Sequence, residues 1–137
     1  MLRLSVVVVT YKQATMLGRC VASIVEQLGA DDELLICDDS SPDETLDVAN
    51  ELARMDARIR VLAAPSNGGV SRNLNRGLDA AQGEFVAIIA GDDAFAPGKV
   101  EAQIARMLAE PSCALSYHDV WVMDASLARR ERRAVAA

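Results

Sequence analysis

The sequence has few aromatic residues, no excess of positive charge and no long apolar run. Aromatic side chains make up 4% of its 137 residues, so a core in this single-domain length must be aliphatic. Acidic residues outnumber basic ones by 20 to 14, which argues against a nucleic-acid-binding face, since that face needs clustered positive charge. No apolar run approaches the roughly 20 residues that cross a bilayer. These absences leave an ordinary globular domain whose partners are not nucleic acids.

Cysteine and histidine are also scarce. The three cysteines, Cys20, Cys37 and Cys113, show no CxxC motif and no close Cys–His spacing. An odd and widely spaced set argues against a disulfide framework or a zinc site, and it suits a reducing compartment. The run Leu4–Val9 is too short for a signal peptide and lacks a small-residue cleavage site. We therefore expect the protein to lie in the cytoplasm.

The basic residues are concentrated near the end of the sequence, where four arginines surround Glu131: Arg129, Arg130, Arg132 and Arg133. The cluster fits a solvated tail or a helix end. It also fits a weak contact with the anionic inner face of a membrane, at roughly 1 kcal/mol per basic side chain. Because the cluster is short and the domain is acidic, the first interpretation is favoured.

Apolar periodicity predicts an alternation of strands and helices. Short runs rich in β-branched residues predict strands at 4–9, 33–37, 59–62, 85–90 and 114–123. Apolar stripes at helical spacing predict helices at 14–28, 42–55, 70–81 and 97–109, the second of them with Ser41 as its N-cap and Pro42 as its first residue. This alternation predicts an α/β, Rossmann-like domain with a mostly parallel sheet flanked by helices on both faces.

Polar residues gather where the predicted strands end. Thr10-Tyr11 follows the first strand, Asp38-Asp39 the second and Asp92-Asp93 the fourth, while the third leads through a glycine-rich loop to Arg72. Open parallel sheets bind ligands beyond the carboxyl ends of their strands, so these groups should share one edge. Each aspartate pair alone is also typical of a turn or a helix cap. Together, four carboxylates repel one another unless a cation relieves them, and oxygen ligands suit Mg²⁺ or Mn²⁺.

Familiar nucleotide motifs are missing from the sequence. It contains no GxxxxGK[ST] motif and no GxGxxG after the first strand, which argues against nucleotide hydrolysis and dinucleotide-dependent redox chemistry. A phospho-accepting receiver domain would be expected to carry an acidic pair after its first strand and a lysine after its fifth. This sequence has neither feature.

Five segments, in this order and spacing, resemble the family 2 glycosyltransferases: Ser5–Tyr11, Cys37–Thr45, Asn67–Asn73, Gly83–Val86 and Gly91–Asp93 followed by Pro97. The resemblance runs from about Leu4 to Met123. It implies a GT-A fold, a nucleotide-diphosphate sugar of uridine or thymidine type as donor, and inversion at the anomeric centre. The implied setting is the synthesis of cell-surface polysaccharide or other glycoconjugates.

The resemblance also implies roles for individual residues. Thr10 and Tyr11 would line the base and ribose pocket, and Asp39, in preference to Asp38, would accept a hydrogen bond from the pyrimidine. Arg72 would lie near the nucleotide or its diphosphate, where its planar fork suits phosphate oxygens. Asp92 would face the ribose or a metal-bound water, and Asp93, with Asp92 beside it, would bind Mn²⁺ or Mg²⁺. Many members carry a further aspartate where this sequence has Ala90.

The acceptor-binding half of the family is not recognisable in this sequence. We expect residues 1–125 to form the nucleotide-sugar-binding domain and residues 126–137 to be a basic tail or the start of the missing half. The catalytic base is unidentified, because neither the spacing of Asp119 and Asp124 nor the lone His118 marks one. The acceptor, whether glycan, lipid or protein, is equally unidentified.

A rival interpretation is a non-catalytic nucleotide-binding or interaction module that kept the donor pocket and lost the acceptor half. In either case, the absence of that half should uncover apolar side chains near the fifth predicted strand, namely Ala114, Leu115, Val120, Trp121 and Val122. Such a patch favours self-association, so we expect a homodimer or larger species at high concentration.

Overall fold

The computed structural model describes residues 1–124, 126 and 128–133. The chain divides into two compact units, one covering residues 1–99 and the other beginning at Val100. Each unit is described by itself. The predicted boundary at residue 125 stays a prediction.

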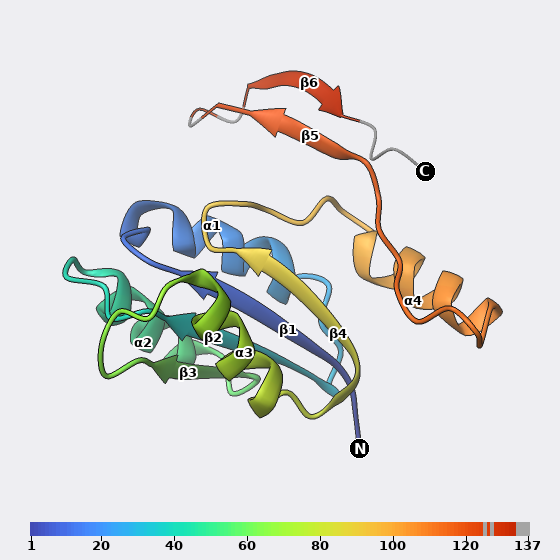
Figure 1. Ribbon diagram of the computed structural model, residues 1–137. Coiled ribbons are helices and arrows are strands. Elements are labelled where there is room, and N and C mark those ends of the chain that lie inside the picture. Colours follow the sequence, from blue (N-terminus) through green and yellow to red (C-terminus); the bar gives the residue numbers. More distant parts are fainter. Residues whose placement is uncertain (125, 127, 134–137) are drawn as a thin grey trace. The chain divides into compact units, whose positions relative to one another are not determined.

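The first unit is built on a parallel sheet of four strands in the order β3-β2-β1-β4 (Figure 1). The strands are β1 (Leu2–Thr10), β2 (Asp32–Asp38), β3 (Ile59–Ala63) and β4 (Gly83–Ala90). The chain moves outward from β1 to β3 and then returns to the other side of β1, so strand order reverses between β1 and β4. This reversal is the topological switch point at which open α/β sheets place ligands.

Helices connect these strands and cover both faces of the sheet. They are α1 (Ala14–Val25), α2 (Thr45–Met55) and α3 (Val70–Ala80). Helices α1 and α2 pack against each other on one face, while α3 lies against β1 and β2 on the other (Figure 1). The predicted mostly parallel sheet with helices on both faces is therefore confirmed for these elements.

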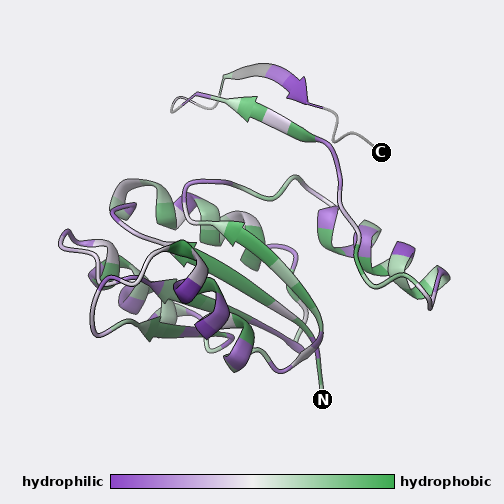
Figure 2. Cartoon of the chain, viewed as in Figure 1, coloured by the Kyte–Doolittle hydropathy of each residue, from purple (hydrophilic) through white to green (hydrophobic). Residues whose placement is uncertain are grey.

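The core is aliphatic, as the scarcity of aromatic residues requires. Strands β1 and β2 are central and covered on both faces, so their β-branched and leucine side chains are almost fully buried. Figure 2 shows the strands as mostly hydrophobic, in contrast to the hydrophilic exposed side of α3. The outer strand β4 differs, because Val86 and Ile88 on one of its faces are about half exposed.

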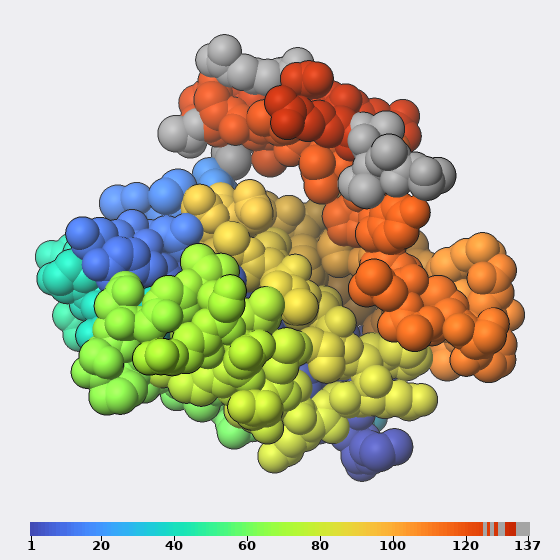
Figure 3. Space-filling model, viewed as in Figure 1, coloured from blue at the N-terminus to red at the C-terminus, as the bar shows by residue number. Residues whose placement is uncertain are grey.

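Helix α3 sits unusually close to the sheet at Gly77. A Cβ placed on this glycine would lie 2.4 Å from Val7 Cγ1 and 2.8 Å from Cys37 Sγ, closer than atoms can pack. Val7, Leu35 and Cys37 form the buried cluster under the helix. Helix α3 and the loop before it make up much of the surface seen in Figure 3. The small residue therefore sets how near the helix and its polar side chains come to the strand ends.

The second unit contains α4 (Lys99–Ala109) from its second residue on, β5 (Val120–Met123) and β6 (Arg129–Arg133). Strands β5 and β6 pair antiparallel, with Trp121 opposite Arg132, in a sheet of their own. The expected fifth strand at 114–123 is thus wrong in length and in partner. The interpretation of the arginine cluster as a helix end is also wrong, because Arg129–Arg133 form strand β6 and pair with β5, while the exposed side chains of Glu131, Arg132 and Arg133 agree with a solvated segment.

Apolar side chains expected to lie uncovered in this segment are exposed. Leu115, Val120, Trp121 and Val122 have 77%, 43%, 45% and 37% of their surfaces accessible, and Ala114 is exposed as well. Self-association through them stays a prediction. In the part of the chain that the structure describes, no helix combines the length and the apolar character that a bilayer span requires.

The contact at Gly77 generates a test of helix packing. We expect Gly77→Ala to lower the free energy of unfolding by about 1–3 kcal/mol, because the added methyl group overpacks the contact with Val7 and Cys37. Urea denaturation measures the change. The matched control is Gly18→Ala in α1, where no atom lies within 4 Å of the new Cβ. This substitution should stabilise the protein by about 0.5–1 kcal/mol, because alanine is the better helix former. Equal effects at both positions would contradict the packing argument.

Candidate functional site

The sheet register brings the predicted polar groups to one edge. Thr10 at the end of β1 is paired with Asp38 at the end of β2, and Val9 is paired with Ala90 at the end of β4. Backbone hydrogen bonds continue this alignment past the strand ends, from Asp39 N to Thr10 O (3.1 Å) and from Gly91 N to Val9 O (2.9 Å). The turns after β1, β2 and β4 are thereby fixed side by side, as the sequence predicted.

Two of these turns hold a residue in the left-handed backbone region. Lys12 has φ 55° and Ser40 has φ 61°, and neither is glycine. Non-glycine residues adopt this conformation rarely, and the cost is of order 1–3 kcal/mol each. The Lys12 N–H donates to Ser41 Oγ (3.0 Å), so the two strained turns are joined directly. Strain concentrated at the carboxyl edge supports a functional role for this edge.

Asp38 is entirely buried and serves the turn that follows it. Its carboxylate accepts hydrogen bonds from Ser41 N (3.0 Å) and Ser41 Oγ (2.5 Å). Ser41 therefore does not cap α2, and that prediction is wrong. The helix begins at Thr45, whose N–H and hydroxyl both donate to the Asp43 carboxylate. A ligand has no access to Asp38 in this arrangement.

Asp39 organises the glycine-rich loop. Its two carboxylate oxygens accept hydrogen bonds from Gly68 N (2.9 Å) and Gly69 N (2.8 Å), and its carbonyl oxygen accepts one from Asn67 Nδ2 (3.2 Å). Gly69 has φ 83°, a conformation that favours glycine. Each carboxylate oxygen retains a second lone pair. Asp39 can therefore hold the loop and accept a further hydrogen bond.

A hollow of about 130 Å³ lies beside Asp39. It is lined by Asp39, Ala64, Pro65, Ser66, Arg72, Asn73 and Arg76. One carboxylate and two guanidinium groups thus meet over small and apolar side chains. This combination suits a ligand that presents an N–H donor at one point and negative or carbonyl oxygens at another.

Arg76 is a functional candidate that sequence reasoning missed, and it acts together with Asn73, which follows the glycine-rich loop. Arg76 Nη2 donates to the carbonyl oxygens of Asp38 (3.0 Å) and Leu62 (2.7 Å) and to Asn73 Oδ1 (2.7 Å). Asn73 Nδ2 donates to the carbonyl oxygen of Cys37 (2.6 Å). The two side chains tie α3 to the ends of β2 and β3 under the hollow. Polar residues on the buried face of a predicted helix were the available signal.

Thr10 and Tyr11 occupy different environments. Thr10 is buried, and its hydroxyl donates to Gln13 Oε1 (2.9 Å). A Cβ on Gly91 would lie 2.9 Å from Thr10 Oγ1, so glycine is needed where the turns after β1 and β4 meet. Tyr11 is exposed, with Lys12 Nζ 5.3 Å from its ring centre. Tyr11 is therefore available to a ligand, while the buried Thr10 supports the turn from below.

The turn after β4 carries the second acidic pair. Asp93 N donates to Ala90 O (3.0 Å), and Arg19 Nη2 donates to Asp92 O (3.0 Å). Within the described residues, neither Asp92 nor Asp93 accepts a hydrogen bond on its carboxylate. Desolvation by the surrounding protein and the charge of Asp92 raise the pKa of Asp93, and the charge of Arg19 opposes them. The pair lacks the donors that Asp38 and Asp39 have.

This acidic pair fits part of a divalent-cation site. Across the described ranges, no group of three His, Cys, Asp or Glu side chains is placed to hold a metal ion. Mg²⁺ and Mn²⁺ are commonly bound by one or two carboxylates, with waters and substrate phosphates completing the coordination. Asp92 and Asp93 match that smaller set. The remaining ligands would have to come from a phosphorylated substrate and water.

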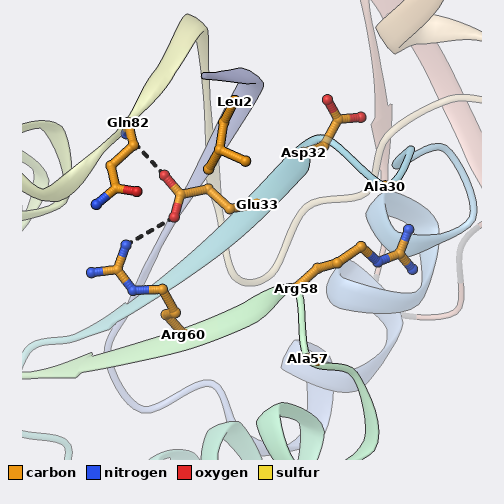
Figure 4. Close-up of a pocket in the computed structure, with 8 residues that line it drawn as sticks. All are labelled: Leu2, Ala30, Asp32, Glu33, Ala57, Arg58, Arg60 and Gln82. Carbon is orange, nitrogen blue, oxygen red and sulfur yellow. Dashed lines mark hydrogen bonds and ion pairs between the residues drawn. The ribbon is translucent and has the colours of Figure 1, made fainter.

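A larger hollow, of about 390 Å³, lies at the opposite, amino end of the strands (Figure 4). One of its two buried acids, Glu33, accepts hydrogen bonds from Ser5 Oγ (2.7 Å), Gln82 N (2.9 Å) and Arg60 Nη1 (2.9 Å). Burial alone would raise the pKa of Glu33, but these bonds together lower it. Both oxygens of this carboxylate have partners within the protein, so we interpret it as a structural link between β1, β2 and β3.

The family model described as glycosyl transferase family 2 matches residues 5–133, nearly the whole chain. The chain belongs to glycosyltransferase family 2. It is 37% identical over 110 residues to the O-antigen biosynthesis protein RfbC of Myxococcus xanthus. It is 33% identical over 113 residues to the chondroitin synthase of Pasteurella multocida. Over 98 residues it is 32% identical to the glycosyltransferase GlyG of Streptococcus pneumoniae.

These relatives are much longer than the chain. The matched segments cover 80%, 82% and 72% of the chain but 9%, 12% and 33% of RfbC, chondroitin synthase and GlyG. The chain thus spans a third or less of each of these family 2 proteins.

Solved structures show the same fold. The mannosyltransferase PcManGT from Pyrobaculum calidifontis, solved with GDP-Man and Mn²⁺, has a TM-score of 0.73 and 25% identity over 80% of this chain and 33% of its own. S. aureus TarS 1-349, solved with UDP-GlcNAc, has a TM-score of 0.73 and 22% identity over 89% of this chain and 40% of its own. The expected GT-A-type fold is confirmed.

The environment of Asp93 generates a test by stability. We expect Asp93→Asn to raise the melting temperature at pH 7 in EDTA, because the ionised carboxylate is unfavourable beside Asp92 without a cation. A raised folded pKa means that stability is lost as pH rises through it, so the difference should vanish at low pH, where Asp93 is protonated. Asp79→Asn, at an exposed position of α3, is the control and should change little. A lower melting temperature for Asp93→Asn would show that its carboxylate has a structural role.

Proposed function

We propose that the chain is the donor-binding part of a glycosyltransferase that takes a sugar from a nucleotide-diphosphate sugar. The observation that carries this proposal is the joint placement of the Asp39 hollow and the Asp92–Asp93 turn at the switch point of a family 2 fold. The hollow offers groups that can bind the base of a nucleotide, and the turn offers groups that can bind a metal-bound diphosphate. RfbC, named for O-antigen biosynthesis, supports a role in making cell-surface polysaccharide.

The base of the donor nucleotide is proposed to occupy the hollow lined by Asp39. The remaining lone pairs of this carboxylate accept a ring N–H, which uracil and thymine carry at N3. Arg72, at the rim, provides a fixed fork for phosphate oxygens. Tyr11 is exposed at the end of β1, where its ring can pack against the base or ribose, while Thr10 supports it from below. Asp38 is left out of this proposal because it is buried.

The diphosphate is proposed to lie beside Asp92 and Asp93, with Mn²⁺ or Mg²⁺ held by Asp93 and assisted by Asp92. Bound there, the ion would stabilise the negative charge that develops on the leaving nucleoside diphosphate. The protein's own contribution is to hold two carboxylates that accept no other hydrogen bond within the described residues. PcManGT, solved with Mn²⁺, supports this dependence. Inversion at the anomeric centre is the stereochemical outcome that we propose.

No side chain of the described residues is assigned as the general base. Asp119 is ion-paired with Arg132, and Asp124 Oδ1 accepts hydrogen bonds from Ser126 N and Oγ. His118 Nδ1 lies 2.7 Å from the carbonyl oxygen of Asp119. All three serve local contacts. The general base and the acceptor site, for a glycan, lipid or protein, are therefore proposed to lie outside these residues. The free thiols favour a cytoplasmic setting.

A panel of nucleotide diphosphates tests the donor site. UDP or dTDP at 100 times its dissociation constant, with Mn²⁺, should stabilise the chain by about 2.7 kcal/mol, which a thermal melt detects. GDP, CDP and ADP measure base preference. If none of these ligands shifts the melting temperature at millimolar concentration with metal present, the donor-site proposal is wrong.

Two substitutions separate the roles of the two acidic groups. Asp39→Asn should weaken nucleotide binding with and without Mn²⁺, because it alters an acceptor facing the base. Asp93→Asn should remove mainly the gain that Mn²⁺ adds. Isothermal titration with UDP in EDTA and in Mn²⁺ gives both quantities, and Asp79→Asn is again the control. Equal loss of both quantities in both variants would defeat the assignment.

A transfer assay distinguishes an enzyme from a binding module. With a nucleotide-sugar donor and a mixed acceptor extract, we expect the isolated chain to transfer little sugar, because positioning of the acceptor can supply roughly 7–11 kcal/mol of the barrier. Transfer as efficient as that of a longer family 2 protein would place the base within the chain. Asp119 and Asp124 would then be mutated first.

A further inference from the structure

Arg19 links helix α1 to the acidic turn after β4. Its Nη2 donates to the carbonyl oxygen of Asp92 (3.0 Å), across a gap of 73 residues in sequence. Its Nε is buried and has no hydrogen-bond partner among the described residues. Figure 1 shows α1 running beside the segment that follows β4. A guanidinium with one donor on the turn and another unused is placed to act by its charge as well as by its hydrogen bond.

The neighbouring residue holds the same turn. Cys20 Sγ donates a weak hydrogen bond to the carbonyl oxygen of Ala90 (3.6 Å), so two consecutive residues of α1 contact the turn two residues apart. Burial, followed by the charges of Asp93 and Asp92, raises the pKa of the Cys20 thiol to about 12, and it stays neutral. Of these two neighbouring residues of α1, Arg19 is therefore the one that brings a positive charge to the turn.

The charge of Arg19 reaches the carboxylates. Its guanidinium donates to the carbonyl oxygen of Asp92, so its positive charge lies on the same turn as the two carboxylates and acts on them at short range. The acidic turn therefore carries two negative charges with one positive charge beside them. Together these features leave the turn far less attractive to a free cation than its two aspartates suggest.

We propose that Arg19 is a positioning residue that makes binding of the divalent cation depend on the donor diphosphate. Resting on the proposed function, this inference assigns the guanidinium two effects. It weakens the hold of Asp92 and Asp93 on a free cation, because like charges repel. It attracts the diphosphate, whose added negative charge then restores a net attraction for the cation. A residue that merely clamped the turn would favour both ligands together and would not weaken the hold on a free cation.

The test compares Arg19→Gln with Arg19→Lys, which keeps the charge. Titration of Mn²⁺ alone, followed by the electron paramagnetic resonance signal of the free ion, should show about three- to tenfold tighter binding for Arg19→Gln. Titration of UDP in EDTA should show weaker binding by a similar factor. Both changes should shrink at high salt, because exposed charges are screened. Arg19→Lys should stay close to wild type in both titrations.

Opposite signs for the two ligands are the decisive result. A purely structural clamp predicts that Arg19→Gln loosens Mn²⁺ and UDP together, independently of salt, and this result overturns the inference. Unchanged Mn²⁺ affinity also overturns it. The same holds if Mn²⁺ binding is too weak to measure in both the wild type and Arg19→Gln. If Arg19→Gln does not fold, the same titrations are compared between Arg19→Lys and Cys20→Ala. Cys20→Ala removes only the neutral strap and should never tighten Mn²⁺, so tightening there contradicts a charge effect.

The failure of this inference can be told apart from failure of the proposed function. A wild-type chain that binds Mn²⁺ but no nucleotide diphosphate defeats the proposed function and, with it, the diphosphate half of the inference. A wild-type chain that binds UDP, combined with an Arg19→Gln variant that does not bind Mn²⁺ more tightly, defeats the inference alone.

Discussion

The position of β1 between β2 and β4 is the constraint on which the rest of this structure depends. A parallel strand hydrogen-bonded on both sides has its carboxyl end in register with two neighbours, here Asp38 and Ala90. Backbone N–H groups just past those ends bond back to Thr10 and Val9, so the turns cannot drift apart. The aliphatic core favours this register, because a slip of one residue would exchange the side chains that pack on the two covered faces of β1. The packing of the core thereby determines where the charged side chains lie at this edge of the sheet.

The two aspartate pairs look alike in sequence, yet their surroundings give them opposite properties. Asp38 and Asp39 are buried, and their carboxylate oxygens accept hydrogen bonds from Ser41, Gly68 and Gly69. Asp92 and Asp93 lie on the exposed turn with no such donors within the described residues. A buried carboxylate without donors is costly, whereas an exposed one stays available to a ligand. The first pair therefore shapes the site, and the second pair is left to bind.

Much of the first unit could be predicted from sequence, because its strands are uninterrupted β-branched runs and its helices show clear apolar stripes. The gathering of Thr10, Asp39 and Asp92 at one edge follows from strand direction alone. Residues 110–133 could not be predicted in the same way, since the pairing of β5 with β6 depends on a partner that no local pattern reveals. Arg19 and Arg76 were missed because long side chains act several residues away in space, and spacing along a helix does not say what they reach. Asp38 was kept as a candidate because sequence cannot show burial.

Asp39 performs two tasks with one carboxylate, and this has a consequence for redesign. The same two oxygens that fold the loop at Gly68 and Gly69 face the hollow where we place the base. Loop order and base recognition are therefore thermodynamically linked, and neither can be altered at this position without altering the other. An engineer who wished to change the nucleotide preference would leave Asp39 untouched. Pro65 and Ser66, which line the same hollow from the end of β3, offer a surface that can be reshaped while the loop keeps its anchor.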